Sequence, residues 1–178
     1  MQDFKAKEAA RASTAAALAA AFPHLVPIGG KVDPLNAAAK NIRIELKLAF
    51  PGIKFSVKSS RFSMGDSIDV SWTDGPNCAQ VNAIVCRYKA GSFDGMTDCY
   101  EYSRSAWTDA FGDTKYLHTS RTNSDIALSS AARTVRARRG VLFPDRELQE
   151  LIYQEARRRT WVVGKALPAA VCRDEVAA

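Results

Sequence analysis

The stretches Ile53-Lys-Phe-Ser-Val-Lys58 and Ser67-Ile-Asp-Val-Ser-Trp-Thr73 alternate apolar and polar residues with a period of two. In a β-strand this period places the apolar side chains on one face and the polar side chains on the other. The intervening residues 59–67 include Gly65 and Asp66, which favour a turn. The two stretches therefore predict a half-buried hairpin over residues 53–73 with a long loop, and the rest of the fold is built around it.

Residues on both sides of this hairpin carry the helical period instead. Before it, Asp33 and Pro34 are typical of a helix start, and apolar residues then recur at three- and four-residue steps as far as Phe50. After it, a second apolar stripe with helical spacing runs over residues 81–88. The predicted core unit is thus helix, strand, strand, helix.

The pattern weakens beyond this unit. Residues 92–113 mix aromatic residues with turn formers and keep no period, so we expect an irregular segment with a short strand near 99–103. Residues 114–121 alternate weakly and predict one more strand. The expected fold class is α+β, with a small antiparallel sheet (hairpin 53–73 plus a strand near 114–121) packed by several helices.

Helices are also expected at both ends of the chain. The alanine-rich residues 5–22 favour a helix that ends before Pro23, and they lack the strong hydrophobes of a secretory signal. Residues 124–139 and 145–161 predict two more helices. The expected organisation is a helical arm and connector at 1–31, an α+β core at 32–123, an Arg-rich helical pair packed on the core at 124–164, and a loose tail at 165–178.

Composition limits the class of protein. The chain has 178 residues, 47% of them hydrophobic and 25% charged, which is typical of one globular core and excludes global disorder. No apolar run is long enough to span a membrane, so no membrane partner is expected. The four cysteines form no C-x-x-C pair, and reduced thiols in the cytoplasm are the expected state.

Motifs for catalysis or metal binding are missing from the sequence. The only histidines are His24 and His118, and no nucleophile elbow, phosphate loop or metalloprotease motif accompanies them. The carboxylates of Asp94, Asp98 and Glu101 do not have the spacing of an EF-hand. The sequence favours a non-enzymatic protein without metal or cofactor, and it leaves open a site that assembles only in three dimensions.

Clustered cations are the strongest candidates for binding. The net charge is +6, which permits an anionic partner without requiring one. Arginine suits phosphate and nucleic-acid contacts because its planar guanidinium carries five donors. A solvated strand face, or favourable placement at helix C-termini, would explain the same residues without a partner. The candidate residues for nucleic-acid or partner binding are Lys54, Lys58, Arg61, Arg133, Arg136, Arg139, Arg157 and Arg158.

Four short motifs in the middle of the chain are specific enough to compare with a known family. They are Asn41-Ile-Arg-Ile-Glu-Leu-Lys47, Phe50-Pro-Gly-Ile-Lys-Phe-Ser-Val57, Asp69-Val-Ser-Trp-Thr-Asp-Gly-Pro76 and Ser92-Phe-Asp-Gly-Met96. Together they resemble the large polyvalent protein associated domain, type 29, over about residues 37–121. The resemblance implies a protein of a phage, plasmid or integrative element, and it brings no catalytic motif that matches residues of this chain.

This setting implies two functions of different classes. A mobile element must survive restriction and CRISPR interference, so the leading expectation is an anti-restriction or anti-CRISPR type of protein that docks on a host defence protein or nucleoprotein complex. The positive net charge argues against imitation of DNA. The alternative is a basic module that binds DNA or RNA for maintenance, transfer or regulation of the element. The oligomeric state stays open in both cases.

Overall fold

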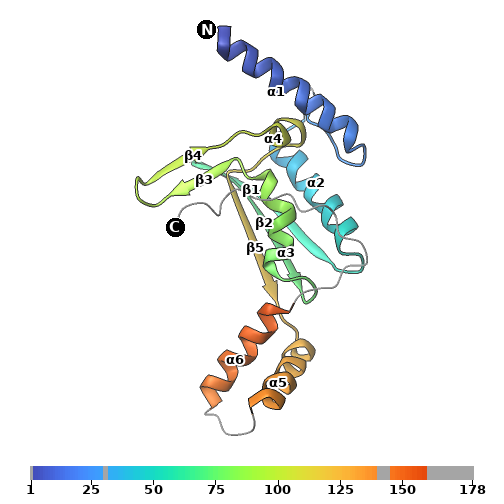
Figure 1. Cartoon of the computed structure of the whole chain (residues 1–178), viewed down its shortest axis with the longest axis vertical. Coiled ribbons are helices and arrows are strands. Elements are labelled where there is room, and N and C mark those ends of the chain that lie inside the picture. Colours follow the sequence, from blue (N-terminus) through green and yellow to red (C-terminus); the bar gives the residue numbers. More distant parts are fainter. Residues whose placement is uncertain (1, 30–31, 140–144, 160–178) are drawn as a thin grey trace.

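The computed structural model of the chain describes residues 2–29, 32–139 and 145–159. It is an α+β structure, as predicted, in which helices cover one face of a three-stranded sheet and a separate two-stranded ribbon projects beside it (Figure 1). The helices are α1 Gln2–Ala21, α2 Pro34–Ala49, α3 Cys78–Val85 (followed by a single 3-10 turn, Cys86–Tyr88), α4 Ala106–Phe111, α5 Asp125–Arg139 and α6 Asp145–Arg158. The strands are β1 Phe55–Phe62, β2 Gly65–Thr73, β3 Gly91–Asp94, β4 Cys99–Tyr102 and β5 Tyr116–Thr122.

The predicted hairpin is present as β1 and β2, which pair antiparallel from Phe55 opposite Trp72 to Phe62 opposite Gly65. The prediction of a long loop at residues 59–67 is wrong. The two strands extend into these residues, and the chain reverses over Ser63 and Met64 alone. Backbone hydrogen bonds can extend a ladder without any apolar alternation, so the polar end of the hairpin left no signal in the sequence.

The third strand is also present, but its direction differs from the prediction. β5 runs parallel to β2, with Ser67 opposite Tyr116 and Thr73 opposite Thr122, so the sheet is mixed and not antiparallel. Residues 74–115 form a crossover long enough to return the chain to the same end of the sheet, which a parallel pair requires. Weak alternation within a strand says nothing about strand direction.

The core lies between the sheet and the helices on one of its faces. α2 and α3 cover this face, as Figure 1 shows, and both contact the sheet. Burial of apolar side chains from both layers supplies the main stabilising term of such a structure. The fully buried apolar residues of this core include Ile42, Leu46, Ile68, Val70, Trp72, Val81, Val85, Tyr88 and Phe111.

Local signals set the start of α2 as predicted. The carboxylate of Asp33 caps the helix by accepting a hydrogen bond from the Asn36 backbone N–H, and Pro34 is the first helical residue. One polar side chain in this helix is completely buried. Asn41 accepts from the Val26 N–H at 2.7 Å and donates to the Val26 and Phe111 carbonyls at 2.9 and 3.0 Å, so it ties three separate segments together.

Residues 92–113 are more regular than expected. They contain the end of β3, all of β4 and helix α4, in place of an irregular segment with one strand. The four-residue strands are too short to show a period. Helix α4 begins at a capping box formed by Ser105 and Thr108, which is the sequence signal that could have predicted it.

The N-terminal helix is present and packs on the body of the protein. The Arg11 guanidinium lies 2.5 Å from the Asp109 carboxylate on α4. The ring of Phe22, just after α1, contacts those of Trp107 and Phe111 at centroid distances of 5.0 and 6.2 Å. The end of α1 is therefore fastened to the body through α4 (Figure 1).

Helices α5 and α6 form a pair at the opposite end of the molecule from α1 (Figure 1). Two hydrogen bonds join the pair to the sheet: Ser124 N–H to the Asp74 carboxylate at 2.8 Å, and Arg121 Nη1 to the Ala156 carbonyl at 3.0 Å. The division of the chain at residues 31, 123 and 164 stays a prediction. The expected tail at 165–178, and the end of the last helix near 161, lie outside the described residues.

The expectation of reduced thiols holds only in part. Cys78 and Cys99 are free, whereas Cys86 is disulfide-bonded, so the expectation is wrong for Cys86. Among the helices in the described ranges, none is long and apolar enough to cross a membrane.

Candidate binding surfaces

The face of the sheet opposite α2 and α3 is polar and exposed. Register places Lys58, Asp69 and His118 side by side in one row across the three strands. The neighbouring rows carry hydroxyl groups, mostly exposed, from Ser56, Ser60, Ser67, Ser71, Thr73, Ser120 and Thr122. A face of this kind can donate many hydrogen bonds, but Asp69 offsets the charge of Lys58 at its centre.

One end of this face is hollowed. The hollow has a volume of about 500 Å³, and the residues that line it are Gly52, Ile53, Lys54, Ser56, Ser71, Trp72, Thr73 and Thr122. Its polar groups are one ammonium and four hydroxyls, with no carboxylate among the lining residues. Such groups can donate hydrogen bonds to anionic oxygens, those of phosphate among them.

The three cations predicted near the hairpin have different surroundings. Lys54 and Lys58 are exposed and have no hydrogen-bond or ion-pair partner within the described part of the chain. Arg61 instead donates to the carboxylate of Asp33, the residue that caps α2. Arg61 therefore has a structural partner, and the two lysines remain open to an external one.

The arginines of α5 and α6 also divide into two groups. Arg138 pairs with Glu155 at 3.2 Å, and Arg159 donates to Ser130 and Thr134, so these two hold the helices together. The group without partners among the described residues consists of Arg133, Arg136, Arg146, Arg157 and Arg158, all exposed. The predicted Arg139 is the last residue of α5, and its side chain lies outside what the structure describes.

The unpaired arginines at the end of α6 lie close to the sheet. The Ala156 carbonyl accepts from Arg121 of β5, so Arg157 and Arg158 follow directly after this contact. Thr122, the neighbour of Arg121, lines the hollow. The end of α6 and the hollow therefore lie at the same end of the sheet. Consecutive residues of a strand point to opposite faces, so Arg121 and the end of α6 lie towards the face that α2 and α3 cover, and Thr122 points to the open face.

A buried polar cluster was not predicted from the sequence. Glu45 of α2 is 3% exposed; it accepts a hydrogen bond from the Tyr88 hydroxyl at 2.7 Å and pairs with the Arg87 guanidinium. The Arg87 guanidinium also lies 4.0 Å from the centre of the Trp107 ring. Burial raises the pKa of Glu45 above its ordinary value, and Arg87 opposes this shift. Burial likewise raises the pKa of the Tyr88 hydroxyl.

This cluster connects α2, the 3-10 turn and α4 inside the protein. Its carboxylate is enclosed, so we interpret it as part of the core and not as a catalytic site. Over the described residues, no three His, Cys, Asp or Glu side chains gather in a way that could hold a metal ion. His118 is exposed on the open face, and His24 contacts the Phe22 ring at 6.0 Å.

Comparison with protein families gives one match. The model of the large polyvalent protein associated domain 29 matches residues 34–127, from the first residue of α2 into the first turn of α5. This confirms the resemblance found in residues 37–121. The matched part includes the sheet, the hollow and the β3–β4 ribbon, and it excludes most of the α5–α6 pair. Comparison with curated proteins and with solved structures found no match.

Proposed function

This chain belongs to the large polyvalent protein associated domain 29 family, and from that membership we propose that it is a non-enzymatic binding protein of a phage or plasmid that counteracts a host defence system. It acts in the host cytoplasm, in the manner of an anti-restriction or anti-CRISPR protein, by docking on a protein or nucleoprotein complex. The family name connects the domain with large polyvalent proteins, which points to a mobile-element or phage-associated protein.

One observation carries the docking step: the exposed cations that have no partner among the described residues. Lys54 and Lys58 lie at the hydroxyl-lined hollow and beside it, and Arg157 and Arg158 follow the contact at the same end of the sheet. Cations that serve only stability would gain from an acceptor within reach, as Arg138 does from the Glu155 carboxylate and Arg159 from the Ser130 and Thr134 hydroxyls. Unpaired cations next to hydroxyl donors suit the phosphates of a nucleoprotein complex.

The alternative function uses the same cations without a defence protein. A basic module for maintenance, transfer or regulation of the mobile element would bind free DNA or RNA, and the binding would weaken steeply with salt because phosphate contacts release counterions. A docking protein would bind the nucleoprotein complex far more tightly than its naked nucleic acid. The ratio of these two affinities separates the functions.

The first experiment measures binding of the purified full chain to labelled duplex and single-stranded DNA and RNA at 50 and 200 mM salt. The variant Lys54→Ala/Lys58→Ala should bind about tenfold more weakly. For duplex DNA, the slope of the logarithm of the binding constant against the logarithm of the salt concentration should be less steep by about 1.8, or about 0.9 for each lost phosphate contact. Lys40→Ala/Lys47→Ala is the matched control, because it removes two exposed lysines from α2, on the other side of the sheet. Equal losses in both variants would show that only net charge matters and that the hollow is not the contact.

The second experiment tests the defence function in cells. Plasmid transformation is measured in hosts with an active restriction or CRISPR system, with the chain expressed as wild type or as Arg133→Ala/Arg136→Ala/Arg157→Ala/Arg158→Ala. The wild-type chain should raise transformation efficiency in a host whose defence it counteracts, and the variant with four substitutions should lose this effect. Strong binding to free nucleic acid without protection in any such host would refute the docking proposal and support the alternative.

A further inference from the structure

Two hairpin tips together expose a continuous apolar surface. The aromatic surface consists of Phe62, Met64, Phe93, Met96, Tyr100, Tyr102 and Tyr116, from the end of β1 and the β1–β2 turn, the β3–β4 ribbon and the start of β5. Ring contacts link several of its members. The distances between ring centroids are 6.0 Å from Phe62 to Tyr116, 5.7 Å from Tyr116 to Tyr100 and 4.8 Å from Tyr100 to Tyr102. Phe93 lies opposite Tyr100 in the ribbon.

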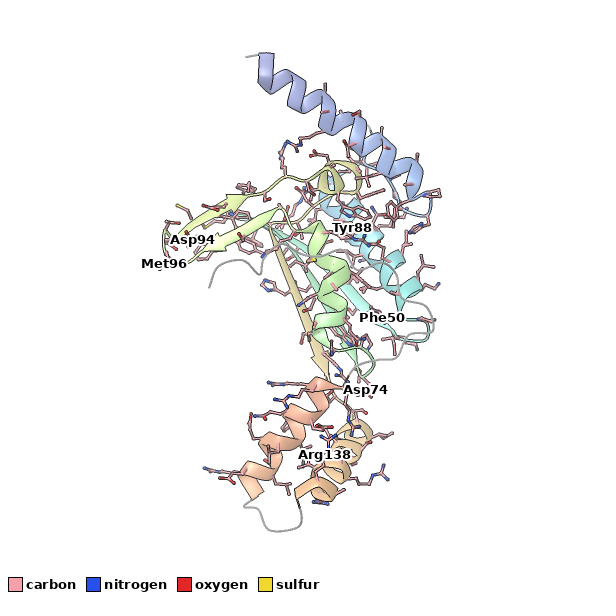
Figure 2. The ribbon with its side chains drawn as sticks, viewed as in Figure 1. Phe50, Asp74, Tyr88, Asp94, Met96 and Arg138 are labelled. Carbon is pink, nitrogen blue, oxygen red and sulfur yellow. The ribbon has the colours of Figure 1, made fainter. Side chains whose placement is uncertain are left out.

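The ribbon has one apolar and one polar face. Because side chains alternate along a strand, Phe93, Tyr100 and Tyr102 share one face, while Asp94, Glu101 and their neighbours share the other. Met96, at the tip, is 95% exposed, and Met64 on the neighbouring hairpin is 77% exposed. Figure 2 shows Asp94 and Met96 at the projecting end of the ribbon, far from Tyr88 in the core.

The ribbon is held in a defined shape at both ends. The Tyr100 hydroxyl, from the middle of the ribbon, donates to the Lys115 carbonyl at 2.6 Å, and at the root a side chain on Gly91 would lie only 1.9 Å from the Glu101 carbonyl oxygen. At its tip, the Asp94 carboxylate accepts from the Met96 N–H and the Thr97 hydroxyl, both at 2.9 Å. The Met96 N–H hydrogen bond lowers the pKa of Asp94. An isolated two-stranded ribbon is marginally stable, so these contacts are what keep it projecting.

The charge around the aromatic surface is opposite to that of the whole chain. Segments 62–66, 91–102 and 113–116 contain five carboxylates and one lysine, in a chain with a net charge of +6. The single lysine, Lys115, donates to the Met64 carbonyl at 2.9 Å and lies 5.0 Å from the centre of the Tyr100 ring. Burial, together with the nearby Asp66, raises the pKa of Asp113, and Arg104 opposes this shift.

We propose that the aromatic surface is a docking site for a segment of a partner protein that combines apolar side chains with lysine or arginine. Exposed apolar patches with a polar rim mark interaction sites, and aromatic residues and methionine are enriched at interfaces. Asp94 and Glu101 lie on the opposite face of the ribbon, so they favour a cationic segment through the field at this end of the molecule, and its ammonium or guanidinium groups can rest on the tyrosine rings. Nucleic acid is a poorer occupant, because a base-stacking surface is normally lined by cations that follow the phosphates.

This surface is distinct from the cations that carry the proposed function, so each can be tested without the other. A library of random peptides displayed on phage is selected against the immobilised full chain and counter-selected against Phe93→Ser/Met96→Ser. The selected peptide is then synthesised, and its affinity is measured by fluorescence anisotropy. We expect a consensus with both apolar and cationic residues, and binding at least about tenfold weaker to the double variant, since two anchors of an interface are removed.

Two further variants make the result specific. Ile126→Ser/Tyr153→Ser removes two exposed apolar residues of α5 and α6 and should change the affinity less than about twofold, because these lie outside the surface. Asp98→Asn/Glu101→Gln keeps the apolar residues and removes two negative charges, and it should weaken binding by about fivefold at low salt and less at high salt. All of the substituted positions are exposed, so the variants are expected to fold.

Five outcomes would overturn the proposal, four of them in the peptide and sedimentation experiments and one with single-stranded DNA. The first four are the absence of a consensus peptide, a consensus without cationic residues, equal binding by the Phe93→Ser/Met96→Ser variant, and self-association of the wild-type chain that this variant abolishes in sedimentation velocity. The fourth would identify a second copy of the chain as the occupant. Binding of single-stranded DNA that is lost in Tyr102→Ala would likewise assign the surface to base stacking.

Discussion

Replacing Arg87 by alanine should leave the buried carboxylate of Glu45 without its counter-charge. In the native protein Glu45 is 3% exposed, pairs with Arg87, and accepts a hydrogen bond of 2.7 Å from the Tyr88 hydroxyl. Removing one member of a buried ion pair costs about 3–5 kcal/mol, because the remaining charge stays out of water. The Tyr88 hydrogen bond remains, which favours the lower end of this range, and loss of the cation–π contact with Trp107 adds about 1 kcal/mol.

We therefore expect the Arg87→Ala variant to be less stable by about 3–4 kcal/mol near pH 7.5. For a chain of this length that corresponds to a fall in melting temperature of roughly 6–16 °C. In a Glu45→Gln background the same substitution leaves no buried charge, so it should cost only about 1–2 kcal/mol. The difference between the two backgrounds, about 2 kcal/mol, measures the coupling between Glu45 and Arg87.

The loss of stability should also depend on pH, with a sign that follows from the pKa of Glu45. Burial raises this pKa in the folded state above 4.5, so the folded protein binds the proton more tightly than the unfolded chain does. Stability contributed by this group is therefore largest at low pH and is lost as pH rises through the folded pKa. Arg87 lowers the pKa, so Arg87→Ala raises it further and extends the loss to higher pH.

Urea unfolding followed by circular dichroism at pH 5 and pH 7.5 would test this reasoning for the wild type, both single variants and the double variant. The cost of Arg87→Ala should be smaller at pH 5, where Glu45 can take up a proton. A cost below about 1 kcal/mol at pH 7.5, or one that is equal at both pH values and in both backgrounds, would show that the pair is not an enclosed ion pair.

Three other substitutions test the packing of the core. Gly112→Ala should cost at least about 2 kcal/mol in thermal unfolding, because Gly112 has φ +95° and the added Cβ would lie 2.2 Å from a backbone oxygen of α2. Gly29→Ala is the control, because an added Cβ there meets open space and should change stability little. Asn41→Ala should cost about 3 kcal/mol by leaving one buried and two partly buried backbone groups unpaired, with the exposed Asn36→Ala as its control. Trp72→Phe should lower the free energy of unfolding by about 1–2 kcal/mol, since the Trp72 indole N–H donates a hydrogen bond of 2.9 Å to the Pro76 carbonyl. Unfolding by urea would measure this loss.

Part of the candidate site could be predicted from residue type alone. Lysine and arginine seldom lie buried, so the exposure of Lys54, Lys58 and Arg157 follows from their chemistry. Which cations lack a partner could not be predicted in this way. Arg61 is one of the candidates for partner binding, but folding brings it to the cap of α2, where Asp33 binds it. The partner lies far away in the sequence, and no local pattern connects the two.

The sequence by itself determined the elements whose signals are local. Alternation around Phe55 and Val70 follows from the two-residue repeat of a strand, and the start of α2 follows from the capping chemistry of Asp33 and Pro34. The four motifs of residues 41–96 also determined the family, which the match over residues 34–127 confirms. These features depend on neighbours in the chain, so the residues themselves are sufficient to predict them.

Only the tertiary structure decided the features that combine distant segments. The parallel direction of β5, the enclosure of Glu45 and the joining of Phe62, Tyr102 and Tyr116 into one surface each depend on how separate elements pack. The free energy of such contacts comes from burial and from pairing across the fold, and it has no period along the chain. The position of Tyr102 in its strand does not decide whether its ring is buried in a core or exposed to a partner. Its exposure follows only from how β4 packs against the other elements.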